Sequence, residues 1–330
     1  CRFGYLSPMG CSMRPTIKRH CARPAVSPLL VDLMQHEYFA LNVRIRDDKT
    51  KRQYRFALGN FRDFLGREPT IDDLDDDTIT RLMIWLRDVR SLHPRTVNDR
   101  RGRINALWSW LANRGHLLKR PTNCPLPVPA RTPRAWTREQ LSQLIRACHE
   151  SPGTFCGMPL STWLLAFHAI AWDTGARTTE MLELRWEWLD WARGWISVPS
   201  DVRKGRRSDR VYRLLPDTLD LLRSFATPHG LLLGYDLHHR AKPDGPERGP
   251  SRVHQIYKEL LQRAGLPDSR YDQPQKLRRS HGSWLAAAGG DATSSLWHTS
   301  PATTRRSYLD PSITAPAPAE RLPFRVLEAG

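Results

Sequence analysis

The sequence predicts a mainly α-helical protein with one small antiparallel β-sheet, divided into two domains by a proline-rich linker. Apolar residues recur at helical spacing along most of the chain, and only the stretch 194–215 alternates in the way of a β-hairpin. Five prolines between positions 119 and 135 remove backbone donors and favour an extended chain. We therefore expect an N-terminal extension (1–26), a helical domain (27–118), a basic linker (119–136), a second domain (137–310) and a C-terminal tail (311–330).

The first domain is predicted to be wholly helical. Ser27 followed by Pro28 fits a helix start, in which a capping residue precedes a first-turn proline. Three apolar stripes at helical spacing indicate helices that share one core, and Gly115 is a stop signal. The stripes are formed by Tyr54, Leu58, Phe61 and Leu65, by Ile79, Leu82, Met83 and Leu86, and by Val97, Ile104, Leu107, Trp108 and Leu111.

The third of these helices also carries arginines between its apolar positions, namely Arg95, Arg100, Arg101 and Arg103. Such a helix can pack through one face and lie on DNA phosphates with the other. A solvated charged face explains the same pattern, so this helix alone leaves both interpretations open.

The second domain opens with a capping-box pattern, Thr137 with Gln140, at a helix start. Two short alternating runs around a basic loop predict a β-hairpin, with apolar positions at Trp195, Ile196, Val198, Val211, Tyr212 and Leu214. Enrichment in Pro, Gly and His marks 228–250 as a loop. The remaining helices are expected at 138–149, 160–174, 178–186, 217–225, 251–264, 276–288, 291–297 and 302–309.

The charge points to a polyanionic partner. Lys and Arg total 51 against 34 Asp and Glu, a net charge of +17. Basic residues that neutralise phosphates release counterions, which favours binding to nucleic acid. A basic protein held on an anionic membrane is the alternative, but the cations are spread through helical segments and not gathered beside an apolar anchor.

Several protein classes do not fit this sequence. It has no run of about 18 apolar residues for a membrane span, and its first 24 residues lack the apolar stretch of a signal peptide. None of the six cysteines forms a CxxC pair, so we expect reduced thiols and a cytoplasmic, DNA-associated protein. A carboxylate cluster, formed by Asp72, Asp73, Asp75, Asp76 and Asp77, suggests a two-metal nuclease, but acids also favour a helix N-terminus. Neither a phosphate-binding GxxxxGK[ST] loop nor an HExxH metal motif is present.

Breaking a phosphodiester without a metal requires a nucleophile, cations on the non-bridging oxygens, and an acid for the leaving oxygen. Arginine suits the oxygens because its planar fork binds them in pairs and keeps its charge. Lysine suits the acid because its pKa falls in a cationic site. Tyrosine suits a nucleophile whose covalent product must persist.

Four sequence boxes in one order supply these groups, and the set resembles the tyrosine recombinases of the phage-integrase type. Residues 173–182 (DTGARTTEML) resemble the family's TGLRxSEL box, and 203–207 (RKGRR) resemble its β-hairpin lysine loop. Residues 275–280 (QKLRRS) resemble HxLRHT, and 296–304 (LWHTSPATT) resemble LGHSSxxTT, followed by Tyr308. Residues 92–98 also look like part of the family's helical, SAM-like core-binding domain.

The resemblance implies a recombinase that cuts and rejoins DNA through a 3′-phosphotyrosyl link. The implied catalytic residues are Arg177, Lys204, Gln275, Arg278, His298 and Tyr308, with Arg206, Arg207 and Arg279 as further DNA contacts besides the arginines of the first domain. It also implies double-stranded DNA as partner, self-association as a tetramer on paired sites, and neither metal nor small-molecule cofactor.

The chain departs from the family pattern at three places. Gln275 stands where the family has His, although Lys276 beside it is an alternative if its side chain turns inward. Trp297 replaces the glycine before His298, and Tyr308 follows His298 by ten positions. These departures leave a second interpretation, a catalytically impaired integrase-like protein that only binds DNA.

Overall fold

The computed structural model describes residues 27–45, 47–200, 209–236 and 250–315. The chain divides into two compact units, and the boundary between them lies between Ala130 and Arg131. Each unit has its own hydrophobic core, and none of the described residues belongs to both cores. Among the described residues, no helix is long and apolar enough to cross a membrane.

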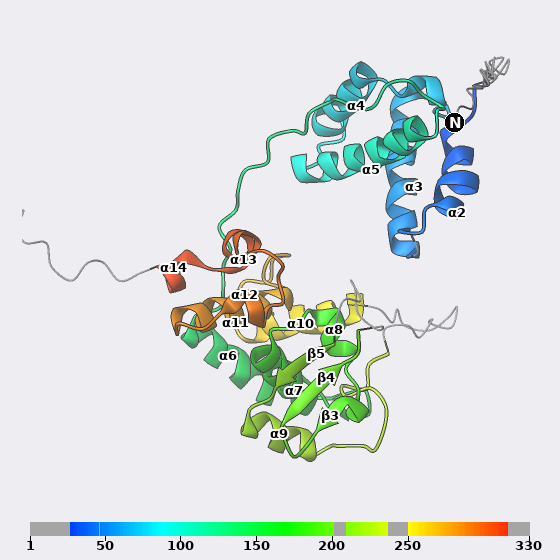
Figure 1. Ribbon diagram of the computed structural model, residues 1–330. Coiled ribbons are helices and arrows are strands. Elements are labelled where there is room, and N and C mark those ends of the chain that lie inside the picture. The colour runs from blue at the N-terminus through cyan, green and yellow to red at the C-terminus, as the bar shows by residue number, and fades with distance from the viewer. Residues whose placement is uncertain (1–26, 46, 201–208, 237–249, 316–330) are drawn as a thin grey trace, which may run out of the picture. The chain divides into compact units, whose positions relative to one another are not determined.

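The N-terminal unit is helical, as predicted (Figure 1). Its first helix contains a π-helical stretch, Leu33–Tyr38, between α1 and α2. A short 3-10 turn, Ile71–Asp73, precedes α4. The α-helical segments are α1 (Leu30–Asp32), α2 (Phe39–Leu41), α3 (Asp48–Leu65), α4 (Asp76–Asp88) and α5 (Pro94–Asn113).

The three predicted apolar stripes form the core of this unit. Helix α5 packs against both α3 and α4. Phe61, Leu86 and Leu107 are completely buried, and of the predicted stripe residues only Leu65 is half-buried. The stripes therefore identified the three packing faces correctly.

The predicted start of the first helix was wrong. The helix begins at Leu30, and Ser27 does not cap it. Instead the Ser27 hydroxyl donates to Asp72, and Leu29 forms a β-bridge with Thr70. This pairing between distant segments holds the chain extended for longer than the local Ser-Pro signal indicated.

The first part of the linker is fastened to the N-terminal unit. The Asp76 carboxylate accepts the backbone N–H groups of Thr122 and Asn123, each at 2.9 Å. The Arg101 guanidinium donates to the Asn123 side chain and carbonyl, both at 2.7 Å. Asp75 caps α4. Asp75 and Asp76, two members of the acidic cluster seen in the sequence, thus have structural partners.

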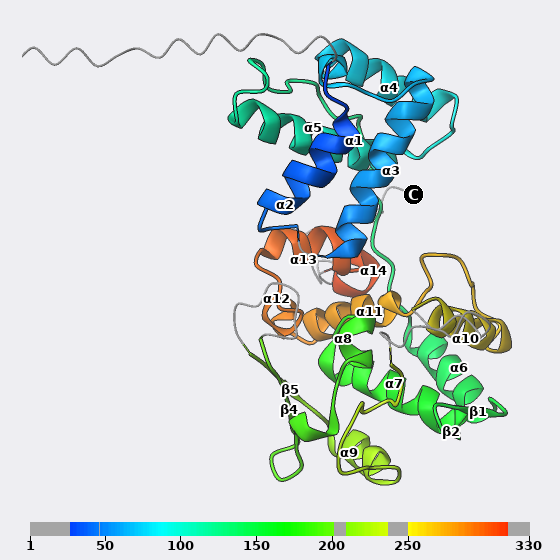
Figure 2. The ribbon, with the colours of Figure 1, turned by 90° about the vertical axis from the view of Figure 1, so that its right-hand side faces the viewer.

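The C-terminal unit surrounds a central helix, α7, with helices and one three-stranded sheet (Figure 2). Its helices are α6 (Arg138–His149), α7 (Leu160–Thr174), α8 (Thr178–Leu182), α9 (Pro216–Arg223), α10 (Pro250–Arg263), α11 (Gln275–Ala287), α12 (Ala292–Ser295), α13 (Pro301–Tyr308) and α14 (Pro311–Thr314). A two-stranded ribbon, β1 (Thr154–Phe155) and β2 (Met158–Pro159), precedes α7. The antiparallel sheet has the order β3 (Leu189–Asp190), β4 (Trp195–Val198), β5 (Arg210–Arg213).

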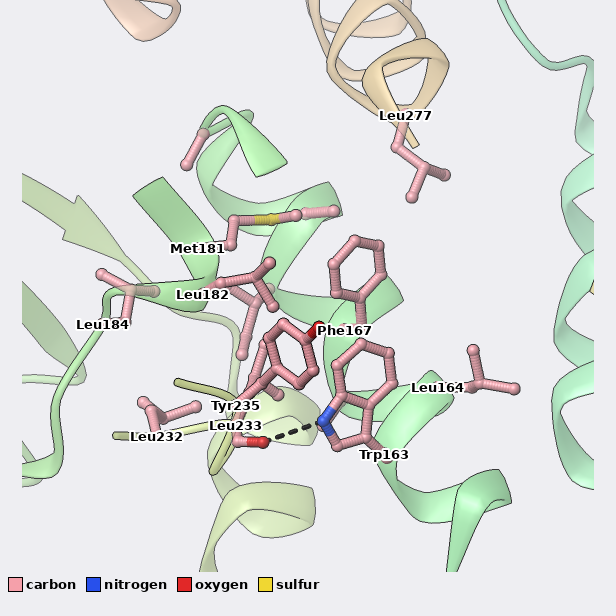
Figure 3. Close-up of a cluster of buried hydrophobic side chains, with 14 of the residues drawn as sticks. Trp163, Leu164, Phe167, Met181, Leu182, Leu184, Leu232, Leu233, Tyr235 and Leu277 are labelled. Atoms are coloured by element: carbon pink, nitrogen blue, oxygen red, sulfur yellow. Dashed lines mark hydrogen bonds between the residues drawn. The ribbon is translucent and has the colours of Figure 1, made fainter. Parts of the chain in front are cut away.

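Helix α7 is apolar on most of its surface and is covered by α6, α9 and α11. Figure 3 shows Trp163 of α7 donating from Nε1 to the Leu233 carbonyl oxygen, 2.8 Å away. The segment around Leu233 was predicted as loop, and it is irregular. Leu232 and Leu233 nevertheless belong to the core, and Leu231 forms a β-bridge with Arg185. The loop prediction is therefore confirmed for the described residues 228–236, and residues 237–249 of the predicted loop lie outside the described part of the chain.

Two larger differences from the predictions concern α8 and the tail; the other helices predicted for this unit begin and end within two residues of the observed ones. Helix α8 ends at Leu182, and a 3-10 turn follows at Trp186–Trp188, because the Trp186 N–H donates to the Gly230 carbonyl instead of continuing the helix. The start of the predicted tail forms α14, which packs against α11. Residues 316–330 of that tail and the basic loop of the hairpin, 201–208, lie outside the described residues.

Candidate active site

The first arginine of the predicted site begins a helix next to a tight turn. Helix α7 ends at Gly175, whose φ of 56° is left-handed; a Cβ there would lie 2.5 Å from the His281 ring. This turn places Arg177 at the N-terminus of α8. Glu180, one turn later, accepts the Arg177 backbone N–H at 3.1 Å and its guanidinium at 2.9 Å. Glu180 therefore orients Arg177 across one helical turn.

A second arginine, Arg210, shares the Glu180 carboxylate, with 3.2 Å between Nη1 and Oε1. Arg210 is only 6% exposed, because strand β5 turns Arg210 and Tyr212 inward and their neighbours outward. Burial alone would raise the pKa of Glu180, but the N–H and charge of Arg177, with Arg210 and Arg278, hold it below its usual value. Glu180 is therefore ionised.

Sequence reasoning did not assign Arg210 to the site. The available signal was strand alternation, since Arg210 lies two positions from Tyr212 and shares its inward face. A charged residue at an inward position needs a buried partner, and that partner, Glu180, lies 30 positions away in sequence.

The second predicted arginine, Arg278 of α11, is 2% exposed. Its guanidinium donates to the carbonyl oxygens of Gly175 and Leu296. Nη2 also lies 3.0 Å from Nε2 of His298. Two backbone carbonyls and one imidazole therefore hold the cation of Arg278 in a single orientation.

His298 is held in one tautomer by its two neighbours. Arginine can only donate, so Nε2 accepts from Arg278 and Nδ1 carries the proton, which it donates to the Thr304 hydroxyl at 2.9 Å. Burial, then the charges of Arg278, Arg177 and Arg210, lower the pKa of His298 to about 4. The imidazole is therefore neutral at ordinary pH, with its lone pair on Nε2.

The turn before His298 has an unusual backbone. Trp297 has a φ of 52°, in the left-handed region that glycine adopts readily and tryptophan does not. The Trp297 ring lies 5.3 Å from the Arg210 guanidinium carbon. Trp297 thus adopts a glycine-like conformation at the position where the family pattern has glycine, and it places an aromatic ring over Arg210.

Tyr308, the predicted nucleophile, is the last residue of α13 and is half-buried. The centroid of its ring lies 4.3 Å from that of His298. The guanidinium carbon of Arg278 lies 5.3 Å from the same Tyr308 ring. Arg278, His298 and Tyr308 thus form one cluster. Burial lowers the pKa of both Arg278 and His298, and Arg177 lies near enough for its charge to help lower both.

The unusual first position of the third box is half-buried. Gln275 begins α11, one turn before Arg278, and the two side chains share a face of the helix. Lys276 points elsewhere: its Nζ donates to Asp272 at 2.8 Å and lies 3.4 Å from the Trp136 ring centroid. The alternative in which Lys276 turns into the site is therefore wrong for this structure.

The predicted DNA-contacting arginines differ in their surroundings. Arg95 is exposed, whereas Arg103 donates to Gln53 at 2.6 Å. Arg100 stacks over Phe56, and Arg101 holds the linker at Asn123. Arg279 donates to the carbonyl oxygen of Tyr271. The remaining predicted residues, Lys204, Arg206 and Arg207, lie outside the described residues.

This geometry suits a reaction in which a bound anion forms a covalent bond with the protein. The arginines provide fixed positive charge, the tyrosine provides a nucleophilic oxygen, and the neutral imidazole provides a proton acceptor. Within the described residues, no group of three or more His, Cys, Asp or Glu could hold a metal ion.

A sequence model of the Phage integrase family matches residues 134–313, more than half of the chain. Tyrosine recombinase XerC of Xylella fastidiosa is 28% identical over 211 residues, which cover 61% of this chain and 64% of that protein. The putative defective protein IntQ of Escherichia coli is 23% identical over 229 residues, covering 59% of this chain and 54% of that protein. The chain thus spans less than two thirds of the length of these curated relatives.

Solved structures show the same fold. The Tn1549 transposon integrase, in complex with transposon right end DNA, matches with a TM-score of 0.63 and 14% identity, over 88% of this chain and 95% of that one. A lambda integrase dimer bound to a COC′ core site matches with a TM-score of 0.61 and 15% identity, over 90% of this chain and 99% of that one. The chain belongs to the Phage integrase family and has the fold of the tyrosine recombinases.

Proposed function

We propose that this chain is a site-specific DNA recombinase that cleaves and rejoins double-stranded DNA through a 3′-phosphotyrosyl bond to Tyr308. The observation that carries the proposal is the cluster at the end of α13. There the Tyr308 ring lies 4.3 Å from a neutral imidazole and 5.3 Å from a buried, fixed guanidinium. A nucleophile beside a proton acceptor and a cation is the arrangement that transfer of a phosphodiester requires.

In the proposed reaction, the Tyr308 oxygen attacks the scissile phosphorus and the bond from phosphorus to the 5′ oxygen breaks. Arg177 and Arg278 bind the non-bridging oxygens and stabilise the charge that accumulates there. A phosphate that takes over the N–H of Arg278 frees Nε2 of His298 to accept the phenolic proton.

Two further roles rest on the resemblance to the family. Lys204 protonates the leaving 5′ oxygen, and Gln275 donates a hydrogen bond to the phosphate. Attack by the 5′ hydroxyl of a second strand on the phosphotyrosyl bond restores a phosphodiester. One ester replaces another in each step, so the reaction needs neither ATP nor another small-molecule cofactor.

The proposal extends to how the DNA is held. The N-terminal unit acts as the core-binding domain, and residues 119–136 form a basic linker between it and the catalytic unit. Arg95 and its neighbours on α5 contact the phosphates, and Arg206, Arg207 and Arg279 do so near the scissile bond. Four copies on two DNA sites carry out the exchange, as in the family.

A second candidate function is DNA binding without cleavage. Gln275 cannot shuttle a proton as the family histidine can, and Trp297 strains the turn before His298. A relative of this chain is itself named a putative defective protein. These observations favour, as the second candidate, a catalytically impaired integrase-like protein that still binds DNA.

A nicked suicide substrate separates the two candidates, because the strand released next to the nick diffuses away and traps the covalent adduct. We expect an adduct with the parent chain. Tyr308→Phe should abolish the adduct and leave the DNA dissociation constant unchanged, since only the attacking oxygen is lost. Tyr271→Phe is the matched control, as Tyr271 is an exposed tyrosine of the same unit, and it should form adduct like the parent. Tight binding by the parent without any adduct would establish the binder instead.

A further inference from the structure

The backbone that carries Tyr308 is held by one buried serine of α11. The Ser283 hydroxyl donates to the Tyr308 carbonyl oxygen at 3.2 Å and accepts the Asp310 N–H at 2.9 Å. Ser283 is fully buried. Helix α13 ends at Tyr308, so the Tyr308 carbonyl has no partner within its own helix. Ser283 supplies that partner from the helix that also carries Arg278.

Asp310, two residues after Tyr308, has a buried carboxylate. Asp310 is 3% exposed and caps α14 by accepting the Ser312 N–H at 3.0 Å. Its other oxygen accepts the backbone N–H of Ala135 at 2.8 Å. Burial opposes ionisation, but these donors hold the pKa of Asp310 below its usual value, so both oxygens accept. The carboxylate therefore joins the segment after Tyr308 to the C-terminal end of the linker.

That end of the linker is firmly attached to the same helix. The Trp136 N–H donates to the Ser280 hydroxyl at 2.8 Å, and the Trp136 carbonyl accepts from the Trp284 indole at 3.0 Å. Trp136 is fully buried and Ala135 nearly so. The linker end, α11 and the residues after Tyr308 thus form one hydrogen-bonded set.

We propose that Ser283 and Asp310 are positioning residues for Tyr308, and that the bond from Ala135 to Asp310 makes the placement of the nucleophile depend on the end of the linker. The inference rests on the proposed function. Arg278 has anchors of its own, because the carbonyl oxygens of Gly175 and Leu296 hold it. His298 contacts Thr304, which lies one turn before Tyr308 on α13 and does not depend on Ser283 or Asp310 for this hydrogen bond. Loss of the Ser283 or Asp310 contact therefore displaces Tyr308 and leaves the phosphate-binding groups in place.

The test uses the full chain with Ser283→Ala, Asp310→Ala and Asp310→Asn, measured for DNA affinity and for single-turnover adduct formation on the nicked substrate. Each rate is taken well below that variant's unfolding transition. We expect a roughly tenfold or greater loss of maximal rate for both alanine variants, because a misplacement of about 1 Å is costly, with little change in affinity. Asp310→Asn keeps one acceptor oxygen and recovers part of the rate.

Ser151→Ala is the matched control, because it removes another buried hydroxyl of the same unit, one that donates to the Ala147 carbonyl at 2.8 Å. It should react like the parent. The inference is overturned if both alanine variants react at the parent rate, or if affinity falls in step with rate and Asp310→Asn is no better than Asp310→Ala. A parent that forms no adduct refutes the proposed function itself, which is a separate result.

The dependence on the linker has its own test. Ala135→Pro removes the linker's donor and leaves Ser283 and Asp310 intact. Its loss of rate and that of Asp310→Ala should not add in the double variant, because both remove the same bond. Additive losses overturn this part of the proposal. If Ala135→Pro fails to fold, amide hydrogen exchange at Ala135 decides instead: exchange must accelerate in Asp310→Ala, and unchanged exchange overturns the link.

Discussion

At the scale of single residues, the charge state of the proposed site is set by contacts among its own members. Burial lowers the pKa of His298, and the charges of three neighbouring arginines lower it further. A proton on this imidazole would face Arg278 at 3.0 Å, so the neutral form is strongly favoured. A neutral imidazole can accept the proton of Tyr308, which a protonated one cannot.

The lowered pKa of His298 predicts an unusual pH dependence. A histidine with an ordinary pKa becomes protonated as pH falls through about 6.5, and it can then no longer accept a proton. We expect adduct formation to show no inflection there, because the pKa of His298 is about 4. Arg210→Gln removes one neighbouring cation and should move the His298 inflection to higher pH. Rate–pH profiles of the two proteins, with an NMR titration of the imidazole, provide the measurement. An inflection near 6.5 in the parent would contradict the arrangement.

The same shift affects stability, and its sign is opposite to that of a histidine with an acidic partner. The unfolded chain binds a proton at His298 below about pH 6.5, whereas the folded chain does so only near 4. The neutral imidazole's contribution to the stability of the folded chain is therefore present above pH 6.5 and is lost as pH falls from there to about 4. The fully buried His168, with a pKa of about 4, adds to this loss.

The third box predicts a contrast among four neighbouring variants. Gln275→His should preserve or raise the cleavage rate, because both side chains can donate to the same phosphate oxygen. Arg278→Ala should lower the rate about 10² to 10³-fold, as loss of a fixed charge-stabilising donor does. Lys276→Ala should reduce the stability of the fold, because Asp272 loses its buried partner. Its cleavage rate should fall less than that of Gln275→Ala.

Single-turnover cleavage of one nicked substrate by the four variants decides between these outcomes. If Arg278→Ala reacts like the parent, the residue assignment in this box is wrong and Arg279 is the next to test. If Lys276→Ala is as damaging as Arg278→Ala, with Gln275→Ala nearly silent, Lys276 enters the site when DNA is bound.

At the scale of elements, the turn between α12 and α13 combines backbone strain with a stacking contact. Trp297 is held left-handed between two short helices. Its ring covers Arg210, which in turn binds Glu180 beside Arg177. The hairpin strand β5, α8 and the His298 turn are therefore connected through two side-chain contacts, although they are far apart in sequence.

The strain at Trp297 predicts a difference between two substitutions that remove the same ring. Trp297→Gly and Trp297→Ala both lose the contact with Arg210, but only glycine adopts a φ of 52° without a steric cost. The glycine variant should therefore be the more stable of the two by about 1 kcal/mol. Denaturant unfolding of both proteins measures the difference. Equal stabilities, or a more stable alanine variant, would show that the turn relaxes when the ring is removed.

At the scale of the whole molecule, two independent cores are joined by a linker that is anchored at each end. Residues 122–126 bind to the N-terminal unit, and 135–136 bind to the C-terminal one. The stretch between them is mostly exposed. Each unit therefore has the contacts to fold without the other.

Separating the chain between Ala130 and Arg131 should weaken DNA binding far more than it unfolds either half. Two linked modules bind more tightly than separate ones, by about 10² to 10⁴-fold, because the second contact is intramolecular. The full chain should also show a steep loss of affinity with salt, corresponding to about 6–10 neutralised phosphates. Binding at several salt concentrations, with circular dichroism melting of each half, tests this. A salt slope near zero, or a separated pair that binds like the intact chain, contradicts two-unit binding.

The sequence predicted the features that depend on residues close to one another along the chain. The two helices at 138–149 and 160–174 begin and end where expected, and the Thr137–Gln140 capping box is present, because hydrophobic period and capping act within a few residues. The order of the four boxes identified the family for a similar reason, since each box is local.

Only the tertiary structure decided which side chains meet. Lys276 and Arg278 are two positions apart, yet one points into the core at Trp136 and the other contacts His298. The capping prediction at Ser27 was wrong because its partner, Asp72, lies 45 positions away. The contact between Ala135 and Asp310 spans 175 positions and leaves no trace in either local pattern. A buried polar group must find a partner wherever the fold brings one close, and that choice depends on the packing of distant elements.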